Sequence, residues 1–118
     1  MTTTTPPNCC AEPAPERPFD EIELASIAKA LAHPARIAIL QAFTECRPHT
    51  AGEVVAGLDL AQSTVSEHLR ILREAGLLSA TPDPPRTWYC IRRPVLEQFA
   101  AQMKDIIDGQ LHAMDAAE

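Results

Sequence analysis

The stretch from Thr50 to Gly76 constrains the fold most strongly, because it contains two helical patterns of unequal length joined by a short turn. Thr50, followed three residues later by Glu53, predicts a helix that begins with a capping box. This helix is short, because the turn-forming Gly57 follows soon after. A longer helix is predicted over Ala61–Ala75, and Gly76 suits the position just after its end. A short helix joined tightly to a longer one is typical of a helix-turn-helix.

The predicted helix Ala61–Ala75 has two chemically different faces. The positions expected to face inward, at helical spacing, are Ala61, Val65, Leu69 and Leu72. The outward positions are polar, and a glutamine and small hydroxyls are side chains that can contact base edges in a DNA major groove. We therefore predict base contacts from Gln62, Ser63, Thr64, Ser66 and His68, and phosphate contacts from Arg70, Arg73 and Arg86.

Each of these assignments has an ordinary alternative. The outward face would also suit a solvated helix surface, and Arg86 would then be a solvent-exposed loop residue. His68 is equally compatible with a buried packing role. Glu67 either shapes specificity, by accepting from cytosine or repelling phosphate, or lies in solvent.

The flanking patterns complete a mainly α, winged helix-turn-helix fold of about five helices and a two-stranded β-wing. A helical stripe with Leu24 and Ile27 begins after Phe19, and Pro34 suits the first position of the next helix, which ends near Glu45–Pro48. Two short strands and a last helix follow. Their predicted ranges are Leu77–Thr81, Thr87–Arg92 and Pro94–Met114, with the wing tip at Pro82–Arg86.

Composition bounds the domain organisation. A chain of 118 residues suits one compact domain, and five prolines in residues 1–18 predict a flexible arm before a domain over residues 19–114. There is no apolar run long enough for a membrane span and no secretory leader pattern, so we expect a cytoplasmic protein without a membrane partner. Its thiols are then expected to be reduced, as ligands, sensors or buried residues rather than as a disulfide framework.

The net charge of −6 is unevenly distributed. From Gln62 to Arg93, five arginines face three carboxylates, so this stretch is net +2 and the remainder is net −8. A DNA-binding domain needs a basic face and not a basic total. The acidic total therefore does not exclude DNA.

The adjacent thiols Cys9 and Cys10 lie in the predicted arm. Neighbouring Cα atoms are about 3.8 Å apart, closer than the usual disulfide range of roughly 4.4–6.8 Å, so a bond between these two would be strained. Two thiolates side by side can still chelate a large, soft centre. Cys46, in the loop after the second helix, is a plausible docking point for such an arm.

Three blocks of sequence resemble the ArsR/SmtB family of repressors, over about Ile22 to Phe99. The blocks are Leu31–Leu40, Gln62–Leu72 and Glu74–Leu77. The resemblance implies a homodimer that binds operator DNA and is released by a metal or metalloid. Two features depart from the family pattern: Ala61 replaces a capping serine, which should cost about 1 kcal/mol, and the wing tip has three prolines.

The cysteine arrangement is similar to one arsenic-responsive subgroup, which has a vicinal pair before the first helix and a third cysteine contributed by the partner subunit. This resemblance implies that Cys9, Cys10 and Cys46 bind trivalent arsenic (arsenite) or antimony as the inducer. The alternatives are a thiol-redox sensor, a soft divalent metal, and an arm whose cysteines have no ligand role. The Cys-x-Cys site that other relatives carry on the third helix is absent from Ala51–Gly57.

Two further candidates are less favourable. Cys90, on the second wing strand, is expected to be a small buried residue rather than a ligand. The last helix carries a possible metal cluster with only one imidazole, which makes a poor zinc site, so a solvated acidic face is preferred. Its members are Asp105, Asp108, His112 and Asp115.

We therefore predict a homodimeric transcriptional repressor and no enzyme, since the sequence contains no catalytic constellation. The dimer seam is expected between the first and last helices, whose apolar stripes exceed what a small domain can bury. Its predicted residues are Leu24, Ile27, Leu96, Phe99, Met103 and Ile107. The alternative from another class is a winged helix used as a protein-interaction module.

Overall fold

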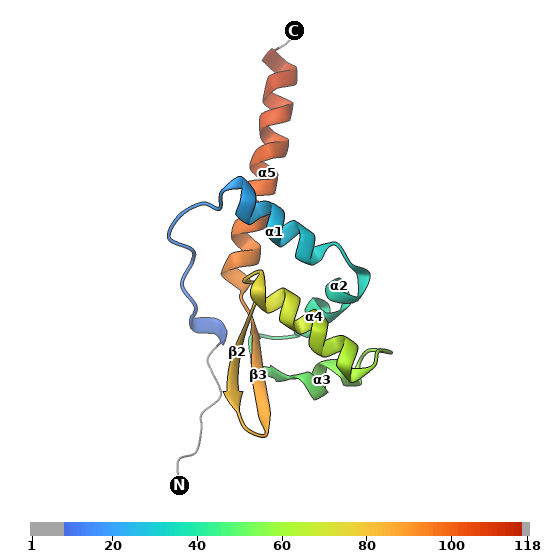
Figure 1. Cartoon of the computed structure of the whole chain (residues 1–118). Helices are drawn as coiled ribbons and strands as arrows, with labels where there is room; N and C mark the ends of the chain where they lie inside the picture. The colour runs from blue at the N-terminus through green and yellow to red at the C-terminus, as the bar shows by residue number, and fades with distance from the viewer. Residues whose placement is uncertain (1–8, 117–118) are drawn as a thin grey trace.

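The computed structural model describes residues 9–116, without the side chains of Cys10 and residues 111–116. Helices, one short sheet and a long terminal helix form an elongated molecule of 68 × 31 × 24 Å (Figure 1). In chain order the elements are η1 (Cys9–Ala11), α1 (Glu21–Leu31), α2 (Pro34–Ala42), β1 (His49–Thr50), α3 (Ala51–Ala56), α4 (Gln62–Glu74), β2 (Leu78–Asp83), β3 (Arg86–Ile91) and α5 (Arg93–Ala116). The predicted mainly α winged helix-turn-helix is confirmed.

Local capping explains where the first helices begin. The carboxylate of Asp20 accepts a hydrogen bond from the Glu23 amide, 2.8 Å away, at the start of α1. Pro34 occupies the first turn of α2, as predicted, and the His33 ring caps that helix by accepting from the Ala35 amide. These short-range contacts set the two helix starts without help from distant residues.

The helix-turn-helix has the predicted chemistry at both ends. Thr50 and Glu53 form the reciprocal capping box at the start of α3. The helix α4 begins after Ala61, whose methyl group cannot accept a hydrogen bond, so its start lacks a side-chain cap. Gly76 follows the end of α4 with φ +85°, a conformation that favours glycine.

The sheet has three strands in the order β1-β3-β2, not the two that the sequence predicts. β2 and β3 form the antiparallel wing, from the Leu78–Ile91 pair to the Asp83–Arg86 pair at the tip. The additional strand β1 pairs His49 with Tyr89. A two-residue strand has too little pattern to be recognised before its partner is known.

The core lies between α1, α2, α3, α4 and the wing. Ile39, Val54, Val65, Leu69, Leu72 and Leu77 are at most 1% exposed. Three of the four predicted inward positions of α4 belong to it, whereas Ala61, at the helix start, is exposed. The apolar stripe of α4 therefore fixes the helix on the body and turns its polar face outward.

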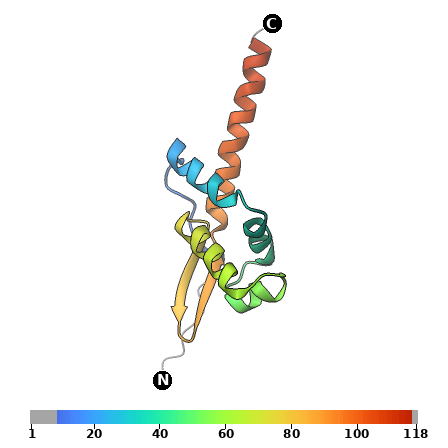
Figure 2. The same ribbon diagram turned by 45° about the vertical axis from the view of Figure 1, so that its right-hand side comes forward.

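The long helix α5 leaves the body and extends away from the wing (Figures 1 and 2). Val95 packs in the core and Phe99 against it, but Ile106 and Ile107, farther along, are 54% and 59% exposed. No helix within residues 9–116 combines the length and hydrophobicity of a membrane-crossing segment.

Candidate nucleic-acid interface and thiol region

The first turns of α4 present the predicted reading face. Gln62, Ser63, Thr64 and Ser66 are all exposed, while Val65 and Leu69 hold the opposite side in the core. Amide and hydroxyl groups on an exposed, firmly anchored helix are suited to contacting base edges. Whether these four residues touch DNA stays a prediction.

A groove separates this face from the wing. Its volume is about 470 Å³, and it runs between the start of α3, Gln62 and the wing tip. Arg86 lines the far side, where its guanidinium lies 5.6 Å from the centre of the Trp88 ring. Tertiary folding thus brings Gln62 and Arg86, 24 positions apart in the sequence, to one polar groove.

The structure does not support a base contact from His68. The residue is only 8% exposed, its Nδ1 accepts a hydrogen bond from Nε of Arg36 (3.2 Å), and its ring lies against that of His33. Burial, aided by the nearby charges of His33 and Arg36, lowers the pKa of His68 below its ordinary value. The alternative packing role is therefore the correct one, because position 68 lies on the inward side of α4.

Most of the arginines in the basic stretch have acidic partners. Arg70 donates to Glu67 and to Glu74, which raises the pKa of Arg70 and, through the hydrogen bond, lowers that of Glu67. Arg93 pairs with Glu97 on α5. Arg73 and Arg86 are exposed, with no carboxylate partner among the described residues. Arg70 must exchange carboxylates for a phosphate if it is to bind DNA, which weakens its predicted contribution.

The thiols are not arranged as expected. Cys9 and Cys90 form a disulfide with a Cα–Cα distance of 5.4 Å, within the usual range. The expectation that the thiols are reduced and form no disulfide framework is therefore wrong for this structure, although Cys90 is buried, at 4% exposure, as predicted. The two residues are 81 positions apart, so no local pattern announces their pairing.

Cys46 is exposed in the loop after α2 and is disulfide-bonded as well. It lines a small pocket with Ile91, the neighbour of Cys90, so the loop and the root of β3 meet. The side chain of Cys10 lies outside the described residues. Three sulfurs would fit a trivalent metalloid only after reduction, because a disulfide sulfur has no thiolate charge to donate.

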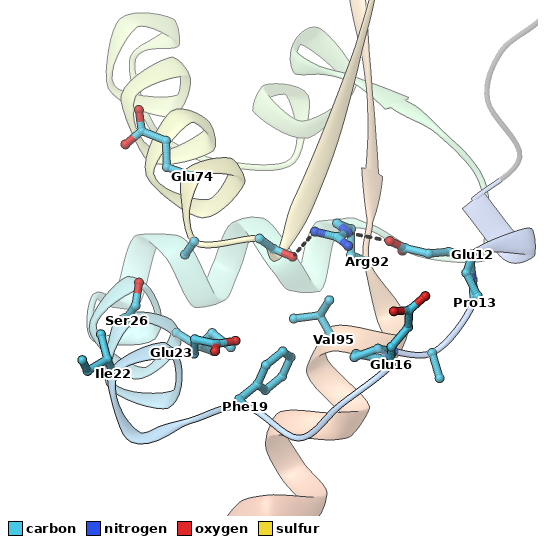
Figure 3. Close-up of a pocket in the computed structure, with 15 residues that line it drawn as sticks. Glu12, Pro13, Glu16, Phe19, Ile22, Glu23, Ser26, Glu74, Arg92 and Val95 are labelled. Carbon is cyan, nitrogen blue, oxygen red and sulfur yellow. Dashed lines mark hydrogen bonds and ion pairs between the residues drawn. The ribbon is translucent and has the colours of Figure 1, made fainter.

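The N-terminal segment follows the body from the wing to α1 (Figure 1). Near its start, Glu12 forms an ion pair with Arg92 (Figure 3). At its end, the Phe19 amide donates to the side-chain oxygen of Gln102 on α5 (2.8 Å). Between these contacts the segment forms one wall of a pocket of about 550 Å³, whose other walls include Ile27 and Val95. Flexibility of residues 1–18 stays a prediction.

The C-terminal cluster receives no support as a metal site from its described members. Asp105 and Asp108 are exposed, and Asp108 pairs with Lys104. The side chains of His112 and Asp115 lie outside the described residues. Within the described part of the chain, no three His, Cys, Asp or Glu side chains are grouped to hold a metal ion.

The predicted dimer residues divide into two groups. Ile27 is 3% exposed and belongs to the core of its own chain, so it has no surface left for a partner, and its assignment is wrong. Leu24, Leu96, Phe99 and Met103 are half-buried, and Ile107 is exposed. The sequence missed Ile22 on α1, which is 81% exposed, because its position relative to the body depends on how α1 docks.

Comparison with known proteins connects this geometry to a family. A helix-turn-helix domain model matches residues 31–79. The HTH-type transcriptional regulator YgaV of Escherichia coli strain K12 is 30% identical, over 71% of this chain and 85% of that protein. The homodimeric winged helix-turn-helix DNA-binding domain Mb0332 from Mycobacterium bovis, a possible ArsR-family regulator, is 25% identical with a TM-score of 0.59, covering 78% of this chain and 84% of that one. The chain belongs to the ArsR family of transcriptional regulators.

A second solved structure supports the same placement. A possible transcriptional regulator for arsenical resistance is 26% identical, with a TM-score of 0.61, over 79% of this chain and 95% of that one. As an ArsR family chain, the protein is a DNA-binding winged helix-turn-helix regulator, and α4 occupies the place of the recognition helix.

Proposed function

We propose that the protein is a homodimeric repressor that binds operator DNA through α4 and loses that affinity when a trivalent metalloid binds its thiols. The observation that carries the DNA-binding half is the groove in which exposed Gln62 faces the wing with Arg86. Exposed Arg73, at the other end of α4, adds a cation for the phosphate backbone. A helix that enters the major groove and arginines beside it that face the phosphates are the contacts expected of such a domain.

A dimer would cover the apolar side chains left exposed on α1 and α5. Ile22, Ile106 and Ile107 are each more than half exposed, and α5 extends beyond the body that its first turns pack against. A second copy along these helices would bury them, and the similar Mycobacterium bovis domain is homodimeric. Ile106→Glu with Ile107→Glu should convert the dimer to a monomer in sedimentation, whereas Gln110→Glu, also exposed on α5, should leave it unchanged.

Trivalent arsenic or antimony is the proposed inducer, through the reduced thiols of Cys9, Cys10 and Cys46. Three thiolates suit the pyramidal coordination of these soft centres. The arm of a reduced chain carries two of the thiols, so a bound metalloid would tie the arm to the loop of Cys46. By linkage, operator DNA must then weaken metalloid binding by the same factor.

The DNA half is tested by fluorescence anisotropy on the promoter DNA beside the protein's own gene. Gln62→Ala should weaken operator binding by about 5- to 150-fold, because one bidentate base contact contributes roughly 1–3 kcal/mol of discrimination. The matched control is Gln41→Ala, which removes an exposed glutamine from α2. Equal affinities of the two variants, or no salt-dependent binding by the wild type, would favour a protein-interaction module instead.

The inducer half is tested by titrating the reduced complex with arsenite. Cys9→Ser, Cys10→Ser and Cys46→Ser should each abolish release, while Cys90→Ser should retain it. Normal release in the first three variants would refute the site. Loss of DNA release in Cys90→Ser alone would place the inducer site on the wing instead.

A second candidate is release by thiol oxidation, which is favoured by the disulfide bonds of Cys9 and Cys46. Peroxide in metalloid-free buffer then lowers operator affinity, and a dithiol restores it. The metalloid sensor instead responds to arsenite while every thiol stays reduced. The two titrations therefore separate the candidates.

A further inference from the structure

Two adjacent links join the N-terminal segment to the root of the wing. The first is the Cys9–Cys90 disulfide, and the second is the ion pair of Glu12 with Arg92. Glu12 follows Cys9 by three residues, and Arg92 follows Cys90 by two. The covalent link therefore holds the carboxylate close to its guanidinium partner.

Arg92 also reaches the end of the recognition helix. Its Nη1 donates to the carbonyl of Gly76, 3.3 Å away, and its backbone amide donates to the carbonyl of Leu77 at 2.9 Å. Gly76 is the left-handed residue that ends α4. One side chain thus contacts both the arm and the turn that connects α4 to β2, and Figure 3 shows Arg92 extended toward Glu12.

The ion pair depends on the covalent link for its strength. The side chains of Arg92 and Glu12 are 38% and 26% exposed, and a partly exposed pair of this kind is weak when its two segments are independent. Once the disulfide closes, the pairing becomes local, and its effective concentration rises. Opening the disulfide lets the carboxylate leave and frees Arg92 for solvent.

We propose that Glu12 and Arg92 are positioning residues that transmit the state of the Cys9–Cys90 pair to the α4–β2 turn. This coupling rests on the proposed function, because its consequence for DNA requires α4 to be the recognition helix. We call the disulfide, Glu12 and Arg92 the arm latch. With the latch closed, the α4–β2 turn is held by the arm, and operator affinity falls as it does in the metalloid-tethered state.

A hydroperoxide is the oxidant that closes the latch. One cysteine thiolate attacks the peroxide, the O–O bond breaks, and a sulfenic acid and water or an alcohol form. The second thiol then displaces the sulfenic oxygen, which leaves as water, and the S–S bond forms. Two electrons pass from the sulfurs to the peroxide, and a dithiol reductant returns them.

The test compares oxidised and reduced protein in a Cys10→Ser, Cys46→Ser background, where Cys9 and Cys90 are the two remaining cysteines and closure of their bond is verified by peptide mass. The measured quantity is the ratio of operator Kd between hydrogen-peroxide-treated and dithiothreitol-treated protein. Glu12→Gln should bring this ratio closer to one by about two- to fivefold, the effect of a single partly exposed ion pair. The control is Glu16→Gln, an exposed carboxylate on the same segment, which should keep the parent ratio.

A second readout does not involve DNA. Hydrogen exchange at the amides of residues 75–77 should be slower in the oxidised than in the reduced parent, and Glu12→Gln should remove this difference. An unchanged Kd ratio and unchanged exchange in Glu12→Gln, with the disulfide formed, would overturn the latch. If the exchange effect appears but reduced protein does not bind the operator, the proposed function fails and the coupling stands.

Discussion

The recognition helix α4 and the N-terminal arm are held to the body by different forces. Val65, Leu69 and Leu72 of α4 are fully buried, so this helix is fixed by apolar packing over about two turns. Among the described residues, the arm is fixed at its start by the Cys9–Cys90 disulfide and the Glu12–Arg92 ion pair. Packing persists under all conditions in which the protein is folded, whereas a disulfide depends on the redox state.

The attachment of α4 to the body is therefore constant, whereas the attachment of the arm depends on the redox state. The predicted DNA-contacting residues lie on the element whose attachment to the body does not depend on thiol chemistry. Cys9 and Cys10 lie on the segment whose attachment that chemistry controls. A regulator needs both kinds of attachment, because the sensor segment must move while the DNA-binding helix stays folded.

The largest expected effect comes from breaking the packing of α4. Leu69→Ala should lower the free energy of unfolding by about 2–5 kcal/mol, because it leaves a cavity at a fully buried position. Chemical denaturation followed by circular dichroism measures this loss. Ser66→Ala, on the exposed face of the same helix, should change stability by less than about 0.5 kcal/mol. Similar losses in both variants would mean that α4 is not fixed by its apolar side.

The arm should contribute somewhat less than the packing of α4 to the free energy of unfolding, and only while its disulfide is formed. Cys9→Ser should reduce the unfolding free energy of air-oxidised protein by about 2–4 kcal/mol, because the lost bond closes a long loop. Denaturation with and without dithiothreitol measures this effect. In the presence of dithiothreitol, the unfolding free energies of the variant and the wild type should be nearly equal. A gap that survives reduction would show that the arm is held by packing and not by the bond.

A smaller, stabilising effect is expected at the uncapped start of α4. Ala61→Ser places a hydroxyl where it can accept from the first amides of the helix, and should raise stability by about 0.5–1 kcal/mol. The thermal midpoint measures this gain, with Ala61→Val as the control that adds no acceptor. If serine and valine are equivalent, another group already satisfies those amides.

The smallest effect is the pH dependence due to His68. Its pKa is lowered from about 6.5 in the folded state, so the neutral ring is favoured by folding. The resulting stability is complete above pH 6.5 and is lost as the pH falls through the lower, folded-state value. His68→Gln should therefore lose less stability than wild type between pH 7 and roughly pH 5, as measured by urea denaturation. Parallel stability curves would show that His68 titrates normally.

The sequence predicts a structural feature well wherever that feature is caused by neighbouring residues. The capping box at Thr50, the proline that opens α2 and the glycine that ends α4 each depend on a few neighbouring residues, and all three are confirmed. The exposed polar face of α4 follows from helical periodicity alone. His68 was ambiguous because it lies at the border of the apolar stripe, where the packing of α2 decides which way it faces.

The sequence by itself therefore determined the order of elements, the winged helix-turn-helix and the exposed polar residues of α4, since periodicity and capping act over a few residues. Only the tertiary structure decided the partner of Cys9, the strand β1 and the contact of Arg92 with both Glu12 and Gly76. These contacts join segments up to 81 residues apart, and their formation depends on how the arm crosses the folded body. No short-range pattern encodes that path.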